Sequence, residues 1–287
     1  MNINDIPVRV VGPGSQQSKL GEAPSYIDMP GDMARYDPPL MPAPEEVLHL
    51  ADASAAMRWL KSALVDCNNT QHRQLANLTQ IDDDSRKLVN QILGEGEVSI
   101  TYDGTPRAKV QESVLAGIWR TFYFDDDGEV AIDLLEVAAV PHIVTAKREK
   151  TQPVDATQNA SSLDVQNAMP ILVELEDRRR DFERSGNTHS INLTLLPLTQ
   201  TELEFIDERL GRGPIDVLSR AYGKCEVIST QSDNVWWVRY FNSMGKLILN
   251  TLEVTDVPQV VVAAAEDIRD SADRLSEILL PYWPDGA

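Results

Sequence analysis

Paired glutamates are the residues of this sequence that most invite a catalytic interpretation. Glu136 and Glu253 stand in the similar segments LLEV and TLEV, and two such carboxylates can act as acid and base on one substrate. An identical position in two similar segments instead favours a structural role, such as accepting hydrogen bonds from backbone or Trp N–H groups. We therefore expect no catalytic residues, and an enzyme using Glu136 and Glu253 is the less favoured alternative.

The histidines and cysteines are not spaced as metal ligands. His72 and His189 each lack a second His or Cys at ligand spacing, so surface or strand-edge positions are expected. Cys67 and Cys225 are the only two cysteines and form no CxxC motif. This excludes a disulfide framework, a zinc cage or an iron–sulfur cluster held on four thiolates of this chain. The sequence predicts no bound metal and no cofactor.

Charge and hydropathy narrow the class of protein further. The 287 residues include 26 Lys and Arg against 45 Asp and Glu, giving a net charge of −19. A nucleic-acid backbone would repel such a chain, since that binding depends on Lys and Arg. The longest apolar run, 260–265, is too short to cross a bilayer, and Pro7 and Gly12 interrupt any export signal. A cytoplasmic protein is expected.

The sequence also resembles itself at an offset of 117 residues, without a gap from His72 to Glu149. Chance similarity is usually short, whereas here glycines, tryptophans and prolines match in one register. The match predicts two copies of one structural unit. It includes Gly94 with Gly211, Trp119 with Trp236, Glu136 with Glu253, and Pro141 with Pro258.

Each copy shows the same succession of predicted elements. A second helix begins at Asp82, or at Thr199 with Glu202 as a capping box, and is expected to end at a left-handed glycine, Gly94 or Gly211. Hairpins and a short helix after Pro141 or Pro258 follow. The remaining predicted elements are opening helices at 49–67 and 165–183, strands near 74–81 and 190–198, hairpin strands at 118–124, 129–137, 235–241 and 246–254, and a last helix at 266–279.

These patterns predict an α+β fold built by tandem duplication of an α/β unit, with mainly antiparallel strands, packed helices and a pseudo-two-fold relation. Residues 1–44 form an extended or disordered Pro-rich leader, because prolines recur without a periodic apolar face. The first repeat spans 45–150 and the second 164–287. A linker of Pro, Gln, Asn and Ser covers 151–163 between them.

Positions where the copies differ are the candidates for partner binding. Trp237 matches Arg120 and, beside Arg239, is a candidate interface anchor, with burial under a helix as an equal alternative. Arg220 and Tyr222, in the loop SRAYGKCE, are further candidates. Tyr36 in the leader is a candidate if that segment lies along a partner.

Long segments of the chain resemble the HupH/HyaF family of hydrogenase expression/formation proteins. They are ILGEGEVSI, LGRGPIDVLSRAYGKC, NVWWVRYFNSMGKLILNTLEVTDVPQVVVAAAEDIRDSADRLSEIL, VVGPGSQ and QESVLAGIWR. These segments are spread from the leader to the last helix, so the resemblance extends over nearly the whole chain. The resemblance implies a role in maturing uptake [NiFe] hydrogenases, with the iron–sulfur small subunit and its twin-arginine export signal as the client. It implies no catalytic residues.

A non-catalytic chaperone or scaffold for the hydrogenase small-subunit precursor is the function expected from these features. Other hydrogenase maturation proteins are further expected partners, and nucleic acid and membrane insertion are not expected. The charge of −19 favours encounter with a basic signal segment. The main alternative is a carrier of a metallocofactor or small molecule in a cleft between the repeats.

Overall fold

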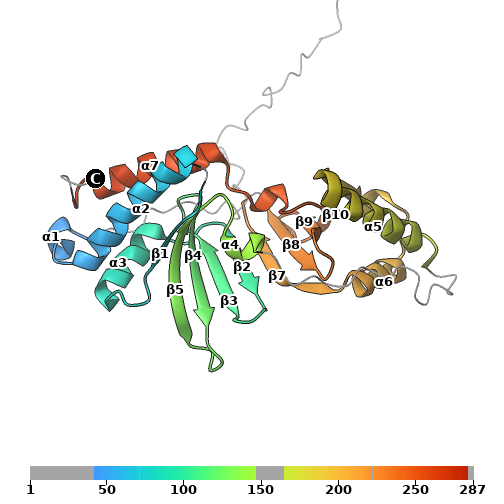
Figure 1. The fold of residues 1–287 in the computed structure, drawn as a ribbon, viewed down its shortest axis with the longest axis horizontal. Helices are drawn as coiled ribbons and strands as arrows, with labels where there is room; N and C mark the ends of the chain where they lie inside the picture. Colours follow the sequence, from blue (N-terminus) through green and yellow to red (C-terminus); the bar gives the residue numbers. More distant parts are fainter. Residues whose placement is uncertain (1–41, 71, 147–164, 222, 284–287) are drawn as a thin grey trace, which may run out of the picture. The chain divides into compact units, whose positions relative to one another are not determined.

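The computed structural model describes residues 42–70, 72–146, 165–221 and 223–283. The predicted linker, most of the predicted leader, Tyr36 and Tyr222 lie outside these residues. The described part combines helices with one antiparallel sheet of ten strands, in the order β1-β5-β4-β3-β2-β7-β8-β9-β10-β6 (Figure 1). This confirms the α+β class and shows that both halves share a single sheet. The strands are β1 (Gln74–Asn77), β2 (Val98–Tyr102), β3 (Ala108–Glu112), β4 (Ile118–Phe124), β5 (Val130–Val137), β6 (His189–Asn192), β7 (Arg212–Ser219), β8 (Lys224–Thr230), β9 (Val235–Phe241) and β10 (Leu247–Val254).

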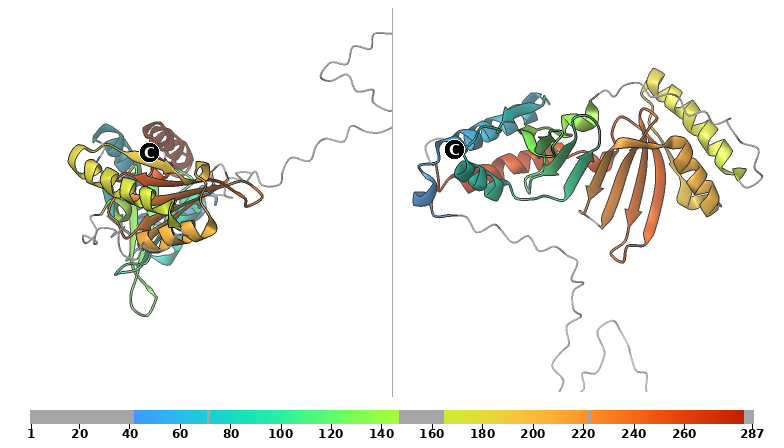
Figure 2. Two further views of the ribbon diagram at one scale, coloured as in Figure 1. Left: turned by 90° about the vertical axis from the view of Figure 1, so that its right-hand side faces the viewer. Right: turned by 90° about the horizontal axis from the view of Figure 1, so that it is seen from below.

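The helices lie towards the two ends of the sheet. One group packs beside β1 and β5, and the other packs beside β6 and β10 (Figures 1 and 2). The first group is α1 (Pro44–Val47), α2 (Ala51–Thr70), α3 (Asp83–Leu93) and α7 (Ala265–Leu279), and the second is α5 (Ala168–Ser185) and α6 (Gln200–Leu210). Short turns α4 (His142–Thr145), η3 (Leu193–Leu195) and η4 (Gln259–Val261) complete the described elements.

The two halves join edge to edge through β2 and β7, which run antiparallel. Val98 pairs with Ser219 and Tyr102 pairs with Ile215. Since Ile215 and Ser219 lie 117 residues after Val98 and Tyr102, each strand contributes the same positions to the junction. The pairing therefore has the self-complementary register that a two-fold relation between halves requires.

Local sequence accounts for the paired helices α3 and α6. Asp82 accepts hydrogen bonds from the N–H groups of Asp84 and Ser85, and Thr199 forms the predicted capping box with Glu202. Both helices end at Gly94 and Gly211 as expected, with φ of +56° and +59°. Their ψ values of −167° and 162° are extended, however, so the left-handed cap predicted from the sequence is wrong in detail.

The gapless match between the halves fails at β1 and β6. Gln74 pairs with Val137, whereas His189 pairs with Val254, so β6 lies 115 residues after β1. The cause is a two-residue longer connection from β6 to α6, which carries η3. His72 and His189 are consequently not equivalent, and both predicted strands are shorter than expected.

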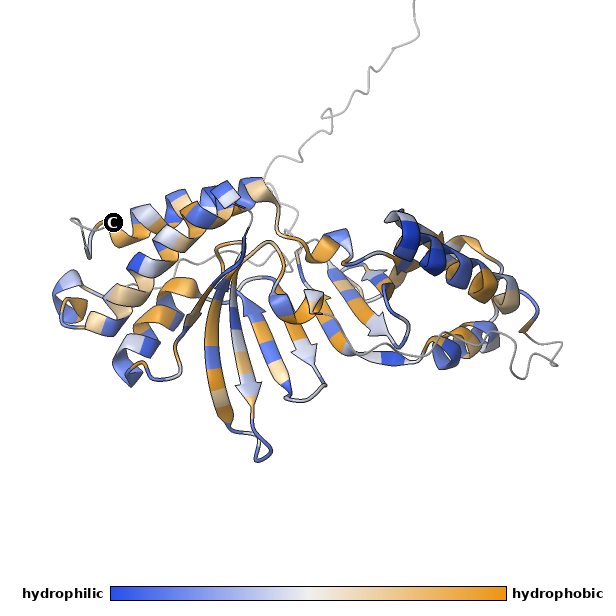
Figure 3. Cartoon of the chain, in the orientation of Figure 1, coloured by the Kyte–Doolittle hydropathy of each residue, from blue (hydrophilic) through white to orange (hydrophobic). Residues whose placement is uncertain are grey.

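The sheet separates three apolar cores. Successive side chains of a strand point to opposite faces of the sheet, so neighbouring strand residues enter different cores. Figure 3 shows hydrophobic and hydrophilic residues interspersed along the strands. One face carries a central core that includes Trp119, Trp236, Ile143 and Val261. Trp119 and Trp236 are both fully buried, and their indole N–H groups donate to the backbone oxygens of Ala138 and Thr255, which are also 117 residues apart. The predicted core role of both tryptophans is confirmed.

Helix α7 completes the core of the other half. Its side chains Ile268, Ala272, Leu275 and Leu279 share a core with α2 and α3, and α7 packs along α2. The apolar stripe predicted for this helix is confirmed, but it covers the first half of the sheet. Just before α7 the chain passes from the second half to the first. There the N–H of Ala263 donates to the backbone oxygen of Ala139 at 2.9 Å.

Candidate functional site

A cavity of about 660 Å³ opens where the two halves meet, beside α4. Its walls come from both halves, which matches the cleft expected for a carrier between the repeats. The residues lining it are Tyr102, Thr105, Pro106, Tyr123, His142, Ile143, Ala146, Arg212, Gly213, Pro214, Thr230, Gln231 and Asp233.

The side chains of this cavity offer hydrogen bonds and aromatic surface. Burial, together with the charge of Arg73, lowers the pKa of His142, so its imidazole is neutral at pH 7. Burial also raises the pKa of Tyr123, which keeps the phenol protonated. Arg212 is already paired with Asp216 at 2.6 Å. The cavity is therefore equipped to hold a neutral polar or aromatic group.

Glu136 and Glu253 do not form a catalytic pair. Seven strand spacings of about 4.8 Å each separate β5 from β10 in the sheet, so the two side chains are too far apart to act on one substrate. Glu136 accepts the backbone N–H of His142 at 2.9 Å, so the predicted structural role is confirmed for this residue. Burial raises the pKa of both carboxyl groups. The indole N–H groups of Trp119 and Trp236 donate to backbone oxygens and not to these glutamates.

Both cysteines are buried, and their surroundings disfavour the reactive thiolate form. Burial raises the pKa of Cys225 to about 11 and raises that of Cys67. His189 pairs with Glu174 at 2.9 Å, and His72 is exposed. Within the described ranges no three His, Cys, Asp or Glu residues gather as a metal-binding group.

The partner-binding candidates have separate environments. Trp237 is 3% exposed under α5 and α6, and its indole donates to the Asn250 side-chain oxygen. Burial under helices, the alternative to an interface anchor, is the environment that the structure shows for Trp237. Arg239 lies over the Trp237 ring, 4.5 Å from its centroid, and is half-buried. Arg220 is exposed at the end of β7, and its N–H donates to Glu97.

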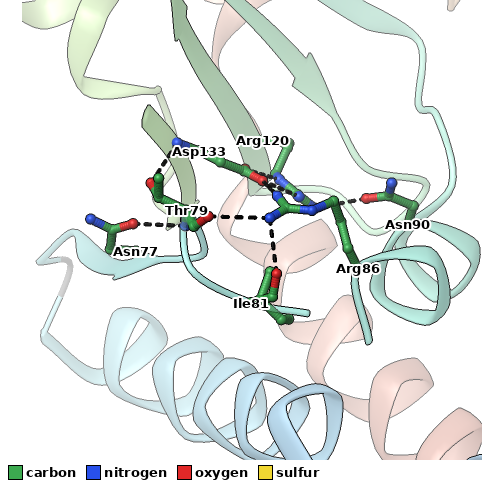
Figure 4. A network of polar contacts seen from close by, with 7 residues as sticks. All are labelled: Asn77, Thr79, Ile81, Arg86, Asn90, Arg120 and Asp133. Atoms are coloured by element: carbon green, nitrogen blue, oxygen red, sulfur yellow. Dashed lines mark hydrogen bonds and ion pairs between the residues drawn. The ribbon is translucent and has the colours of Figure 1, made fainter. Parts of the chain in front are cut away.

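A buried ionic network occupies the corresponding place in the first half (Figure 4). Arg120 replaces Trp237 and forms a bidentate pair with Asp133, which is 1% exposed. Asn90 accepts a further hydrogen bond from Arg120 at 2.9 Å, and Arg86 also pairs with Asp133. Such a network fixes strand and helix positions.

Sequence reasoning missed this network, although the self-comparison contained a signal. Arg120, Asp133 and Arg86 match Trp237, Asn250 and Leu203, so three substitutions change together. Co-located differences of this kind indicate that one ionic cluster in one half replaces an apolar one in the other.

Comparison with known proteins identifies the family. The model of the HupH hydrogenase expression protein, C-terminal conserved region, matches residues 50–161 and 165–281. Hydrogenase expression/formation protein HoxQ from Cupriavidus necator is 39% identical over 280 residues, covering 97% of this chain and 98% of the relative. The HoxQ protein of Azotobacter vinelandii is 41% identical over 278 residues, or 96% and 98% of the two chains. The chain belongs to the HupH/HyaF family of hydrogenase expression/formation proteins.

Its place in the HupH/HyaF family agrees with the segments that carried the resemblance in the sequence. The two matched ranges correspond to the two halves of the sheet. A solved structure, the hydrogenase expression protein HupH from Thiobacillus denitrificans, is 28% identical, with a TM-score of 0.38, and covers 39% of this chain and 94% of its own. A search of the described helices finds none long and apolar enough to span a membrane.

Proposed function

We propose that this HupH/HyaF protein is a non-catalytic chaperone or scaffold that binds the iron–sulfur small-subunit precursor of a [NiFe] uptake hydrogenase before export. The observation that carries the proposal is the match over nearly the whole chain to hydrogenase expression/formation proteins. The chemistry of the chain supports it. The two repeated carboxylates, Glu136 and Glu253, lie on strands seven spacings apart in the sheet, and both thiols are buried with raised pKa values.

The charge of the chain supports contact with a basic signal segment. A net charge of −19 produces an attractive field for Arg-rich peptides, and such attraction weakens as salt rises. The encounter takes place in the cytoplasm, where the precursor and its signal are still together.

Affinity purification tests this function. The tagged chain is purified from cells that express the hydrogenase operon and from cells that lack it, and the bound chains are identified by mass spectrometry. The small-subunit precursor is expected only in the first preparation. A parallel purification with a signal-deleted precursor, at low and high salt, tests the electrostatic contact. Recovery of no hydrogenase component, or recovery unaffected by both changes, contradicts the corresponding part of the proposal.

We also propose that the halves arose by tandem duplication and are related by a pseudo-two-fold axis, with repeats at 45–150 and 164–287. The β2–β7 register and the equal bounds of β4 and β9, and of β5 and β10, support this history. The offset of two residues at β6 is then a later insertion.

The cavity between the halves favours a second function, the carriage of a small molecule or metallocofactor. Its volume of about 660 Å³ suits one drug-sized group. Native mass spectrometry and metal analysis of the protein purified from hydrogenase-expressing cells would detect such a ligand. A mass equal to that of the bare chain, without colour or metal, contradicts the carrier function and leaves the chaperone function as proposed.

A further inference from the structure

Five exposed large apolar side chains of the second half lie on one hairpin and on the short helix beside it. Met244, in the turn between β9 and β10, is 84% exposed, and Ile248, near the start of β10, is 55% exposed. The short helix η3 contacts β10, where Thr194 Oγ1 accepts the N–H of Asn250 at 2.8 Å, and its Leu195 is 79% exposed. We call this surface the hairpin patch, and its residues are Leu195, Leu196, Met244, Leu247 and Ile248.

The matching hairpin of the first half has an acidic tip in place of this apolar one. Both tips form the same turn, closed by the same two backbone hydrogen bonds. The first-half turn carries four carboxylates, whereas the second-half turn carries none and has Lys246 as its one charged residue. Met244 stands where the first half has Asp127, and Ile248 stands where it has Ala131. The apolar tip is therefore not required by the fold of the hairpin.

The other side of the hairpin patch also belongs to the second half. The connection from β6 to α6 is two residues longer than that from β1 to α3, and it carries η3 with Leu195 and Leu196. Two separate differences between the halves, in a turn and in a connection, thus place apolar side chains on one surface. Apolar surface left exposed in a chain of net charge −19 is typical of a binding site.

The strand β10 has an open edge beside the hairpin patch. Strand β6 pairs only with Thr251 to Val254, so Leu247 to Leu249 have no described strand on that side. A register shift against β9 bends β10 at the same residues and keeps this edge short. An extended peptide can add to such an edge through main-chain hydrogen bonds, with its side chains on the flanking surface.

The dimensions of the hairpin patch favour a peptide segment over a second folded copy of the chain. Stable interfaces between folded proteins engage about 20–30 residues on each side. The hairpin patch offers five apolar side chains and an edge of three residues, which suits a segment anchored by a few side chains. The flexible Met244 side chain can also adapt to apolar partners of varied sequence.

We propose that the hairpin patch binds a short, extended apolar segment of an unfolded partner polypeptide. The segment lies along the open edge of β10, and its side chains pack against Leu195, Met244 and Ile248. Burial of apolar surface supplies the affinity, because none of the residues of the patch is charged. The inference rests on the proposed chaperone function for the identity of the partner, since a precursor held before it folds still exposes such segments.

Fluorescence anisotropy with the full chain tests the inference. The probe is a short labelled peptide of alternating Leu and Ser with a Lys at each end, and the comparison peptide has Asn in place of every Leu. The Leu peptide is expected to bind more tightly and to keep its affinity as NaCl rises, because salt screens charges but not apolar contacts. Equal binding of the Asn peptide, or loss of binding at high salt, would overturn the proposal.

Substitutions taken from the first half locate the binding. Met244→Asp with Ile248→Ala introduces the first-half residues at two positions of the same turn and strand, and should weaken binding of the Leu peptide about tenfold. The matched control, Leu48→Asp with Leu280→Ala, removes two exposed apolar side chains beside α1 and α7 and should change affinity less than about twofold. Equal losses in both pairs would contradict the proposal. If circular dichroism shows that the first pair is unfolded, Leu195→Ser alone is used, and unchanged affinity then contradicts it.

Two further measurements separate this inference from the proposed function and from self-association. In the affinity purification, Met244→Asp with Ile248→Ala should recover less precursor than the wild type, and undiminished recovery contradicts the inference while the chaperone function stands. Binding of the Leu peptide without recovery of any precursor by the wild type contradicts the chaperone function and supports the patch. Analytical ultracentrifugation that shows a dimer abolished by the same two substitutions would assign the patch to a second copy and overturn the proposal.

Discussion

Ile100 on β2 pairs directly with Val217 on β7, and these two residues occupy the same position in their halves of the chain. Both are buried in the central core. A residue that meets its own counterpart marks the position of the pseudo-two-fold relation, as at the centre of an isologous dimer interface. The sheet is continuous there, because β2 and β7 are hydrogen-bonded neighbours in it.

The first prediction is that the two core tryptophans contribute equally to stability. Trp119→Phe and Trp236→Phe each leave a small void and an unpaired backbone oxygen, at Ala138 or Thr255, and each should lower the free energy of unfolding by about 2–4 kcal/mol. Urea denaturation measures both. Trp59→Phe, at a half-buried position, is the control and should cost less. A near-zero effect for either core variant would show that the two environments differ.

The second prediction concerns the buried ionic network. Asp133→Ala leaves Arg120 buried without its partner and should cost about 3–5 kcal/mol in the free energy of unfolding. The second half supplies the control, since Arg86→Leu, Arg120→Trp and Asp133→Asn together reproduce its apolar version. The triple variant should cost less than Asp133→Ala in the same urea measurement. A larger cost would mean that the ionic network cannot be replaced at this site.

The third prediction follows from Glu112 on β3. Burial, with Glu97 and Asp267 nearby, raises its pKa to about 7 from an ordinary value near 4.5. The folded state then holds a proton that the unfolded state has lost, so stability falls as pH rises between those two values. The loss amounts to about 3 kcal/mol at most.

Urea denaturation at pH 5 and pH 8 checks this pH dependence. Glu112→Gln should remove most of the difference, while Glu95→Gln, at an exposed position, should leave it unchanged. Equal pH dependence in the wild type and Glu112→Gln would show that Glu112 titrates normally.

The fourth prediction compares two glycines with positive φ, Gly117 and Gly128. It distinguishes the stability cost of backbone strain from that of disturbing the contact between Gly117 and α7. Gly117 and Gly128 have φ of +80° and +85°, but only a Cβ at Gly117 meets another residue, Ile268, at 2.6 Å. Gly128→Ala should cost about 1 kcal/mol through the backbone alone. Gly117→Ala should cost about 1–3 kcal/mol more, because it displaces Ile268. Faster amide hydrogen exchange in α7, seen only for Gly117→Ala, would confirm the contact, and equal costs would contradict it.

The fifth prediction is that neither thiol reacts in the native protein. Because burial raises the pKa values of Cys67 and Cys225, alkylation by iodoacetamide at pH 8 should be slow until the chain is unfolded. A Ser243→Cys variant, in the exposed β9–β10 turn, provides a thiol that should react within the same assay. Rapid labelling of wild type would mean that a core opens readily.

Local sequence signals predicted where helices and strands lie in the chain better than they predicted which elements pack or pair with one another. Asp82 and Thr199 determine where α3 and α6 begin, because a helix cap acts through the adjacent backbone. The position of β6 was predicted two residues out of register, because it depends on the length of a distant connection and on pairing with β10. Trp237 illustrates the same limit for the candidate site. Its side chain alone does not reveal that α5 and α6 cover it.

The sequence pattern did not predict that α7, which follows the second half in the chain, packs on the first half. The reason is related. The apolar stripe at Ile268, Ala272 and Leu275 predicts an amphipathic helix but carries no information about which surface it covers.

The position of α7 also orders events during synthesis. The core around α2 and α3 needs Leu275 and Leu279, which leave the ribosome after every strand of the sheet has been translated. The first half is thus completed last, although its other residues are made first. On the ribosome, the apolar face of α2 therefore stays without its α7 cover until that later helix has emerged.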